Sequence, residues 1–110
     1  ELKNKQWTLD ELMARGEKTY GTYCAGCHMA DGSGLPPAFP ALKNSAVAKG
    51  PIESHADIVL NGKTGTAMQA FAAQLSEVDI AAVVTYERNA WGNNVGDMLT
   101  PQQVAGMKKQ

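Results

Sequence analysis

The sequence has no excess of charge of either sign and no long apolar segment. Its 110 residues carry a formal net charge of −1 at neutral pH. A nearly neutral protein lacks the basic surface that binds nucleic acids and anionic membranes, so we expect neither as a partner. No apolar run approaches the roughly 18 residues that a transmembrane helix needs, and no secretory signal opens the chain.

Aromatic side chains are scarce, at 6% of residues, whereas the chain contains 11 glycines. A domain of this length buries only about two-thirds of the surface that its unfolded chain exposes. With so few large side chains, a large apolar cofactor at the centre would supply the missing core. The composition therefore favours a single small domain whose loops wrap around a prosthetic group.

The chain has only two cysteines, and both belong to the run Cys24-Ala25-Gly26-Cys27-His28. This C-x-x-C-H pattern is the attachment signature of a c-type haem. Each thiol can add across one vinyl group of the same porphyrin, and His28 then lies beneath the iron as an axial ligand. The pattern predicts one covalent haem c per chain, which leaves no cysteine for a disulfide.

Two other kinds of site use the same spacing of cysteines. A thioredoxin-like dithiol would begin a helix that follows a strand, but nothing before Cys24 has the pattern of a strand. A structural zinc site would require two more cysteine or histidine ligands, and the chain offers only His55 beyond the motif. Covalent haem is the remaining interpretation.

Capping patterns predict an all-α fold with three main helices and a short C-terminal helix. Four pairs of residues have the pattern of a helix N-terminus: Thr8 with Glu11, Ser54 with Asp57, Ser76 with Asp79, and Thr100 with Pro101. The second helix should end at Asn61-Gly62, and His55 near its start is expected to be exposed. Residues 1–7 are expected to form a linker from an upstream segment, and residues 8–110 a single domain.

Three prolines and two glycines between Asp31 and Pro40 exclude a helix or a central strand in that segment. We expect this loop to offer a backbone carbonyl to the ring N–H of His28, which would fix the tautomer and raise the basicity of the ligand. The spacing leaves open whether Pro36, Pro37 or Pro40 is nearest to that carbonyl. A surface connector without this role is the alternative.

The sixth position of the iron decides between electron transfer and ligand chemistry, and five methionines are candidates. Met29 adjoins His28, and Met13 belongs to the apolar face of the first helix. Met98 and Met107 lie in the tail. Met68 stands on an irregular segment between two predicted helices, where the chain can cover the opposite haem face. Ligation by His28 and Met68 would keep the iron six-coordinate and raise its reduction potential relative to two histidines.

With these motifs in place, the chain resembles the class I cytochromes c over nearly its whole length. Segments 57–71 and 84–94 are similar to the cytochrome c domain fused to subunit II of bacterial cytochrome c oxidases. The resemblance implies the class I fold, in which the first helix crosses the helix from Ser76, with Gly16 and Tyr20 at the crossing. Gln69 departs from the family, because many relatives have proline after the ligand methionine.

The resemblance also implies a function and a location. The domain would accept an electron from an upstream cytochrome donor and pass it to the dinuclear copper centre of the preceding domain, on the periplasmic side of the inner membrane. It would be tethered there to a membrane oxidase, although the chain itself carries no catalytic residue.

Several alternatives stay open. The domain could be a free-standing periplasmic electron shuttle, or a haem enzyme or gas sensor whose sixth position is open. Trp91 and Arg88 are candidate partners of the haem propionates, with a packed tryptophan and a solvated arginine as the other interpretation.

Overall fold

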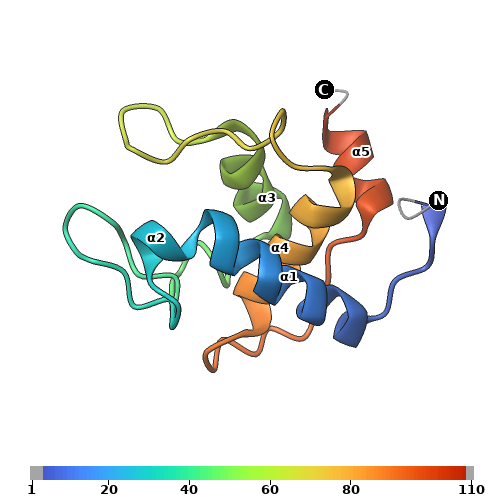
Figure 1. The fold of residues 1–110 in the computed structure, drawn as a ribbon, viewed down its shortest axis with the longest axis horizontal. Helices are drawn as coiled ribbons and strands as arrows, with labels where there is room; N and C mark the ends of the chain where they lie inside the picture. Colours follow the sequence, from blue (N-terminus) through green and yellow to red (C-terminus); the bar gives the residue numbers. More distant parts are fainter. Residues whose placement is uncertain (1–3, 109–110) are drawn as a thin grey trace.

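The computed structural model describes residues 4–108 as an arrangement of helices and loops (Figure 1). The helices within that range are α1 (Leu9–Tyr23), α2 (Ala25–His28), α3 (Ile52–Asn61), α4 (Glu77–Asn89) and α5 (Pro101–Lys108). The only β pairing among the described residues is an isolated bridge between Leu35 and Phe39. The prediction of an all-α fold is therefore confirmed, with α2 as an additional single turn that carries Cys27 and His28.

Helices α1 and α4 cross at the centre of the molecule (Figure 1). A Cβ atom on Gly16 would meet the carbonyl oxygen of Ala82 and lie 2.6 Å from Cβ of Tyr86. The absence of a side chain at Gly16 thus lets the two backbones touch, as the sequence predicted. Beside the crossing, the ring of Tyr20 packs 5.5 Å from that of Tyr86 and 5.0 Å from that of Trp91, measured between centroids.

Three of the four predicted helix starts are confirmed. The hydroxyl oxygens of the three capping residues accept hydrogen bonds from backbone N–H groups in the first turn: Thr8 from Glu11, Ser76 from Asp79 and Thr100 from Gln103. The predicted start of α3 at Ser54 is wrong, because the helix begins at Ile52, directly after Pro51. The predicted end at Asn61-Gly62 is confirmed, and Gly62 has a φ of 74°.

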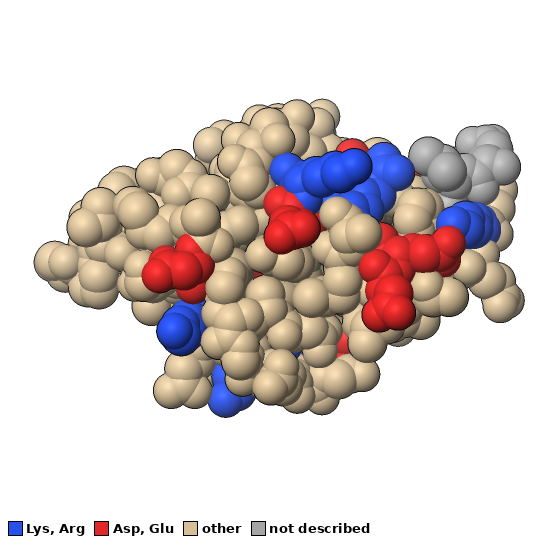
Figure 2. Space-filling model, turned by 60° about the horizontal axis from the view of Figure 1, so that its bottom comes forward, with Lys and Arg blue, Asp and Glu red and all other residues tan. Residues whose placement is uncertain are grey.

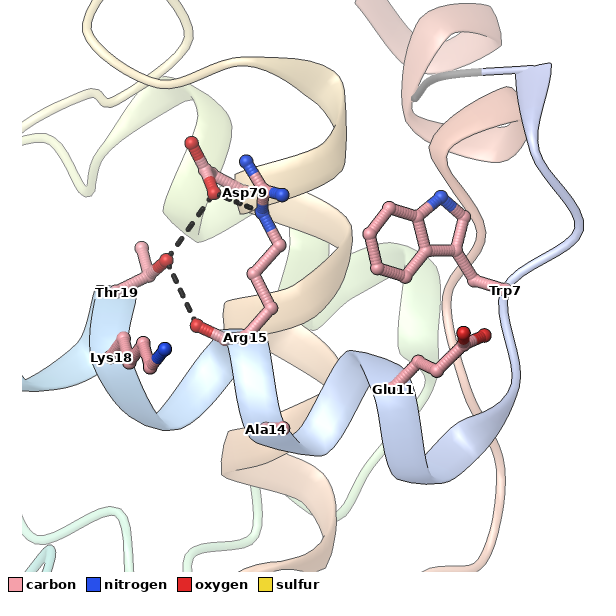
Figure 3. A pocket seen from close by; sticks show the side chains of 7 residues that line it. All are labelled: Trp7, Glu11, Ala14, Arg15, Lys18, Thr19 and Asp79. Atoms are coloured by element: carbon pink, nitrogen blue, oxygen red, sulfur yellow. Dashed lines mark hydrogen bonds and ion pairs between the residues drawn. The ribbon is translucent and has the colours of Figure 1, made fainter. Parts of the chain in front are cut away.

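The segment before α1 is held against the helices by its side chains. Residues 1–3 of the expected linker lie outside the described residues, but Trp7 packs against the core and Lys5 forms an ion pair of 2.7 Å with Glu11. Figure 3 shows Trp7 beside Arg15, whose guanidinium group binds Asp79 of α4 at 2.7 Å. These contacts join the start of the described chain to the α1–α4 pair.

Two side chains of the α4 region hold the irregular segments in place. Arg88 is buried, pairs with Asp97 and donates to the carbonyl oxygens of Ala48 and Gly50. The amide of Asn93 accepts from the backbone N–H of residue 44 and donates to the carbonyls of residues 42 and 87. The long connection between α2 and α3 is thus fastened to the end of α4.

Candidate functional site

A cavity of about 400 Å³ lies among α3, α4, the turn that carries the C-x-x-C-H motif, and two loops. Figure 1 shows these loops, after α2 and after α3, extending on the same side of the helices. Most of the wall is apolar, and its aliphatic and aromatic members include Leu42, Ile58, Val59, Phe71 and Val83. A cavity of this chemistry suits a large apolar group whose position is set by a few polar contacts.

Cys24, Cys27 and His28 all line this cavity. Cys24 is the last residue before α2 and is buried, whereas Cys27 is exposed. Burial raises the pKa of the Cys24 thiol, and the nearby negative charge of Glu87 raises it further. Both cysteines are therefore unpaired thiols in the wall of the same cavity.

The His28 ring is oriented by the loop that follows it. Its Nδ1 donates to the carbonyl oxygen of Pro40 at 2.8 Å, and of the three candidates that the sequence left open, the structure places Pro40 at the ring. With the proton on Nδ1, the lone pair of Nε2 is free to bind a metal. The loop is held by backbone bonds from Gly34 to His28 and between Leu35 and Phe39.

Met68 lies on the loop between α3 and α4 and is partly buried in the cavity wall. Among the described residues, which include all five methionines, it is the only methionine that lines the cavity. Its backbone is fastened on both sides, because Lys63 N–H donates to its carbonyl and its own N–H donates to the hydroxyl of Thr66. The cavity therefore brings together the thiols, the imidazole and the thioether that the sequence singled out.

The prediction that His55 is exposed is wrong. Its relative exposure is 3%, and its Nε2 lies 2.7 Å from Oε1 of Glu87, which is 4% exposed. His55 shares the spacing of one helix face with Ala56, Val59 and Leu60, and this face of α3 is buried. Both His55 and Glu87 line the cavity.

Sequence reasoning missed Glu87 altogether. A usable signal was present, because Glu87 continues the row Ile80, Val83, Val84 at the i, i+3, i+4, i+7 spacing of a buried helix face. A carboxylate in such a row needs a partner, and His55 provides one.

Neither of the candidate propionate partners lines the cavity. Arg88 is buried and binds Asp97 and the carbonyl groups of Ala48 and Gly50, so the interpretation of Arg88 as a solvated side chain is wrong. Trp91 is packed in the aromatic cluster, and its indole N–H donates to the carbonyl of Ala30.

The site does not fit the zinc interpretation. Within residues 4–108, no three histidine, cysteine or acidic side chains come together in a way that could hold a metal ion. A haem fits better, because the wall is largely apolar, the thiols lie together and one imidazole nitrogen is available as a ligand. The same part of the chain contains no helix long and apolar enough to cross a membrane.

Comparison with known proteins places the chain among haem proteins. Residues 11–86 match the family described as cytochrome c oxidase, cbb3-type, subunit III. Cytochrome c-552 of Thermus thermophilus is 31% identical, in an alignment that covers 88% of this chain and 96% of that protein. The mostly helical structure is that of the class I cytochromes c, as the sequence predicted.

Other relatives are parts of larger redox proteins. The gluconate 2-dehydrogenase cytochrome c subunit of Pantoea cypripedii is 31% identical over 94% of this chain and 26% of its own length. The alcohol dehydrogenase (quinone) cytochrome c subunit of Gluconobacter oxydans is 31% identical over 84% of this chain and 22% of its own length. The chain thus spans about a quarter of these curated relatives.

A solved structure has a similar fold. Dihydro-heme d1 dehydrogenase NirN, in complex with DHE, aligns with a TM-score of 0.62 and 29% sequence identity, over 69% of this chain and 16% of that chain.

Proposed function

This chain belongs to the cytochrome c family and is an electron-transfer domain, and we propose that Cys24 and Cys27 attach one haem c covalently while His28 and Met68 bind its iron. The observation that carries the proposal is the presence of all four side chains in the wall of one cavity. The haem would supply one-electron chemistry at its iron, and the chain supplies its ligands and its surroundings.

Each of these residues has a defined part in the proposal. The two thiols fix the orientation of the group, and Pro40 holds the His28 ring with Nε2 available. Met68 offers a soft, neutral sulfur that favours the ferrous state. Because both axial positions would be filled, the site would reorganise little on electron transfer and would exclude small ligands.

The surface near the cavity supports docking of another redox protein. Tyr23 and Val47 line the cavity and are both 46% exposed, and Leu35 on the loop after α2 is 55% exposed. In the view of Figure 2, few charged side chains lie over the end of the molecule where these loops project. A largely apolar contact of small area is typical of brief redox encounters.

The partner and the location belong to the proposal as well. Relatives that are cytochrome c subunits of dehydrogenases support a redox enzyme as the partner. The location on the periplasmic side of the inner membrane stays a prediction. Electron delivery to the copper-bearing domain of an oxidase subunit II stays a prediction. Stopped-flow mixing of the reduced protein with that copper domain would test it.

The experiment that tests the ligand set compares the wild type with Met68→Ala in the ferric and ferrous states. The wild type should show the weak red charge-transfer band of a methionine-ligated ferric haem and should not bind carbon monoxide. Met68→Ala should lose the band and bind the gas. Met98→Ala is the matched control, because Met98 packs on the core and does not line the cavity.

Two results would contradict the proposal. Haem that can be extracted by acid-acetone would show that the thiols do not attach it. Ready binding of carbon monoxide by the wild type would mean an open sixth position and would favour the haem enzyme or gas sensor.

A further inference from the structure

The residue directly after the proposed ligand His28 has a strained backbone. Met29 follows the single turn α2 with a φ of 69° and a ψ of 155°, a conformation that is essentially restricted to glycine. A residue with a side chain persists in this region only where the surrounding structure holds its backbone in place. The contacts that hold Met29 therefore bear on the position of His28.

Two of these contacts converge on the carbonyl oxygen of Met29. It accepts from the hydroxyl of Tyr20 at 2.7 Å and from the backbone N–H of Gly32 at 3.0 Å. Tyr20 belongs to α1 and is 2% exposed, and its ring packs against those of Tyr86 and Trp91. The hydroxyl donor is therefore fixed to the α1–α4 crossing.

Trp91 holds the next residues of the same turn. Its indole N–H donates to the carbonyl oxygen of Ala30 at 3.1 Å. Its ring lies against Gly32, where a Cβ atom would come within 2.6 Å of the indole. The carbonyl of Gly32 in turn accepts from the backbone N–H groups of Leu42 and Lys43. Both ends of the loop that follows α2 are thus joined at this turn.

The same loop brings the carbonyl of Pro40 to Nδ1 of His28. Rotation at Met29 would change the direction in which the chain leaves α2, so release of its strain would displace the segment that leads to Pro40. We propose that Tyr20 and Trp91 are positioning residues, which hold the strained Met29 turn and thereby keep the Pro40 carbonyl on the His28 ring. This inference rests on the proposed function, in which His28 is an axial ligand.

The consequence concerns the chemistry of the imidazole. A hydrogen bond from Nδ1 to a carbonyl fixes the tautomer that leaves Nε2 available and raises the basicity of that nitrogen. A more basic ligand stabilises the ferric state relative to the ferrous state. Side chains that do not line the cavity would in this way act on the iron through the backbone after His28.

The direct test is Tyr20→Phe, which removes the hydroxyl and keeps the buried ring. The chain contains only two histidines, so the Nδ1 proton of His28 can be followed in the ferrous holoprotein labelled with ¹⁵N-histidine. Loss of one neutral hydrogen bond should accelerate the exchange of this proton with solvent by about fivefold. Trp91→Phe should act in the same direction, because it removes the bond to Ala30.

A second substitution separates positioning from general stability. Glycine adopts the backbone conformation of Met29 without strain, so Met29→Gly combined with Tyr20→Phe should return the exchange close to the wild-type rate. Thr19→Val is the matched control, since it removes the neighbouring hydroxyl of α1, which bonds to Arg15 and Asp79 rather than to the turn. It should lower the stability without changing the exchange.

The outcomes separate this inference from the proposed function. If Tyr20→Phe shows the methionine charge-transfer band and exchanges the His28 proton at the wild-type rate, the inference fails and the ligand set stands. Equal acceleration by Tyr20→Phe with and without Met29→Gly would also overturn the inference, because the hydroxyl would then not act through the strained residue. If the wild type has neither that band nor a protected Nδ1 proton on His28, the ligand set is wrong and both proposals fail.

Discussion

Thr66 is the side chain that holds the proposed ligand Met68 in its loop. Its hydroxyl donates to the carbonyl of Lys63 at 2.7 Å and accepts from the N–H of Met68 at 3.2 Å. The loop therefore has an internal clamp next to the thioether. On the other side of Met68, Gln74 donates to the side chain of Gln69, so a glutamine pair braces the position where many relatives have proline.

We expect Thr66→Val to weaken the bond between Met68 and the iron. Loss of a hydrogen bond of about 1 kcal/mol corresponds to roughly a fivefold increase in the population without that bond. The rate of imidazole binding to the ferric protein measures this population. Thr66→Ser should restore the wild-type rate, because serine keeps the hydroxyl.

The control for this prediction is Thr64→Val, which changes an exposed threonine of the same loop. If it accelerates imidazole binding as much as Thr66→Val does, general loosening of the loop explains the effect. In that case the hydroxyl of Thr66 has no specific role.

At the scale of elements, the α1–α4 crossing positions the site. Helix α1 leads into the motif, and α4 contributes Val83 and Glu87 to the cavity wall. The ion pair from Arg15 to Asp79 and the contact at Gly16 fix the two helices relative to each other. A displacement at the crossing would therefore change the spacing between the thiols and the opposite wall.

Gly16→Ala should destabilise the holoprotein by about 2 kcal/mol. The added Cβ meets backbone atoms of α4, which no side-chain rotation can relieve. Overpacking of this kind costs about 1–3 kcal/mol, and here the upper end should outweigh the gain of about 1 kcal/mol in helix propensity. Urea unfolding followed by circular dichroism measures the difference.

Gly21→Ala, in the same helix, is the matched comparison. Apart from the backbone of its own helix, no atom lies within 4 Å of a Cβ placed there, so this substitution should stabilise the protein by up to about 1 kcal/mol. Equal effects of the two substitutions would mean that the crossing is not tight.

At the scale of the whole molecule, the cavity is large relative to the protein that surrounds it. Unfilled space in protein cores costs about 24 cal/mol per Å³, so a cavity of about 400 Å³ corresponds to an upper value on the order of 10 kcal/mol. This equals the whole stability of many small domains. The group that fills the cavity should therefore be part of the core.

Removal of the attachment thiols tests that dependence. We expect Cys24→Ala with Cys27→Ala, prepared without haem, to lose cooperative thermal unfolding while keeping part of its helicity. Addition of haem should restore a cooperative transition at a lower temperature than in the covalent holoprotein. An apoprotein that melts cooperatively at the holoprotein temperature would show that helix packing alone supports the fold.

The features that the sequence predicted correctly are local ones. Capping at Thr8, Ser76 and Thr100 depends on hydrogen bonds within one turn. The close helix crossing at Gly16 was also predicted correctly, because glycine in a helix interior lowers helix stability and is expected where another helix must approach closely. The same local rule was wrong at Ser54, where Pro51 starts the helix earlier.

The remaining features required distant segments to meet. Pro40 was one of three equal candidates until the loop brought its carbonyl to the His28 ring. His55 was expected in solvent, and Glu87 was not considered, because the interaction of each depends on a residue 32 positions away on another helix. Thus the sequence by itself determined three of the four predicted helix starts, through hydrogen bonds within one turn, and indicated haem c as the cofactor, through motif spacing. Only the tertiary structure decided which buried polar residues lie in the wall of the cavity, because packing between α3 and α4 pairs His55 with Glu87.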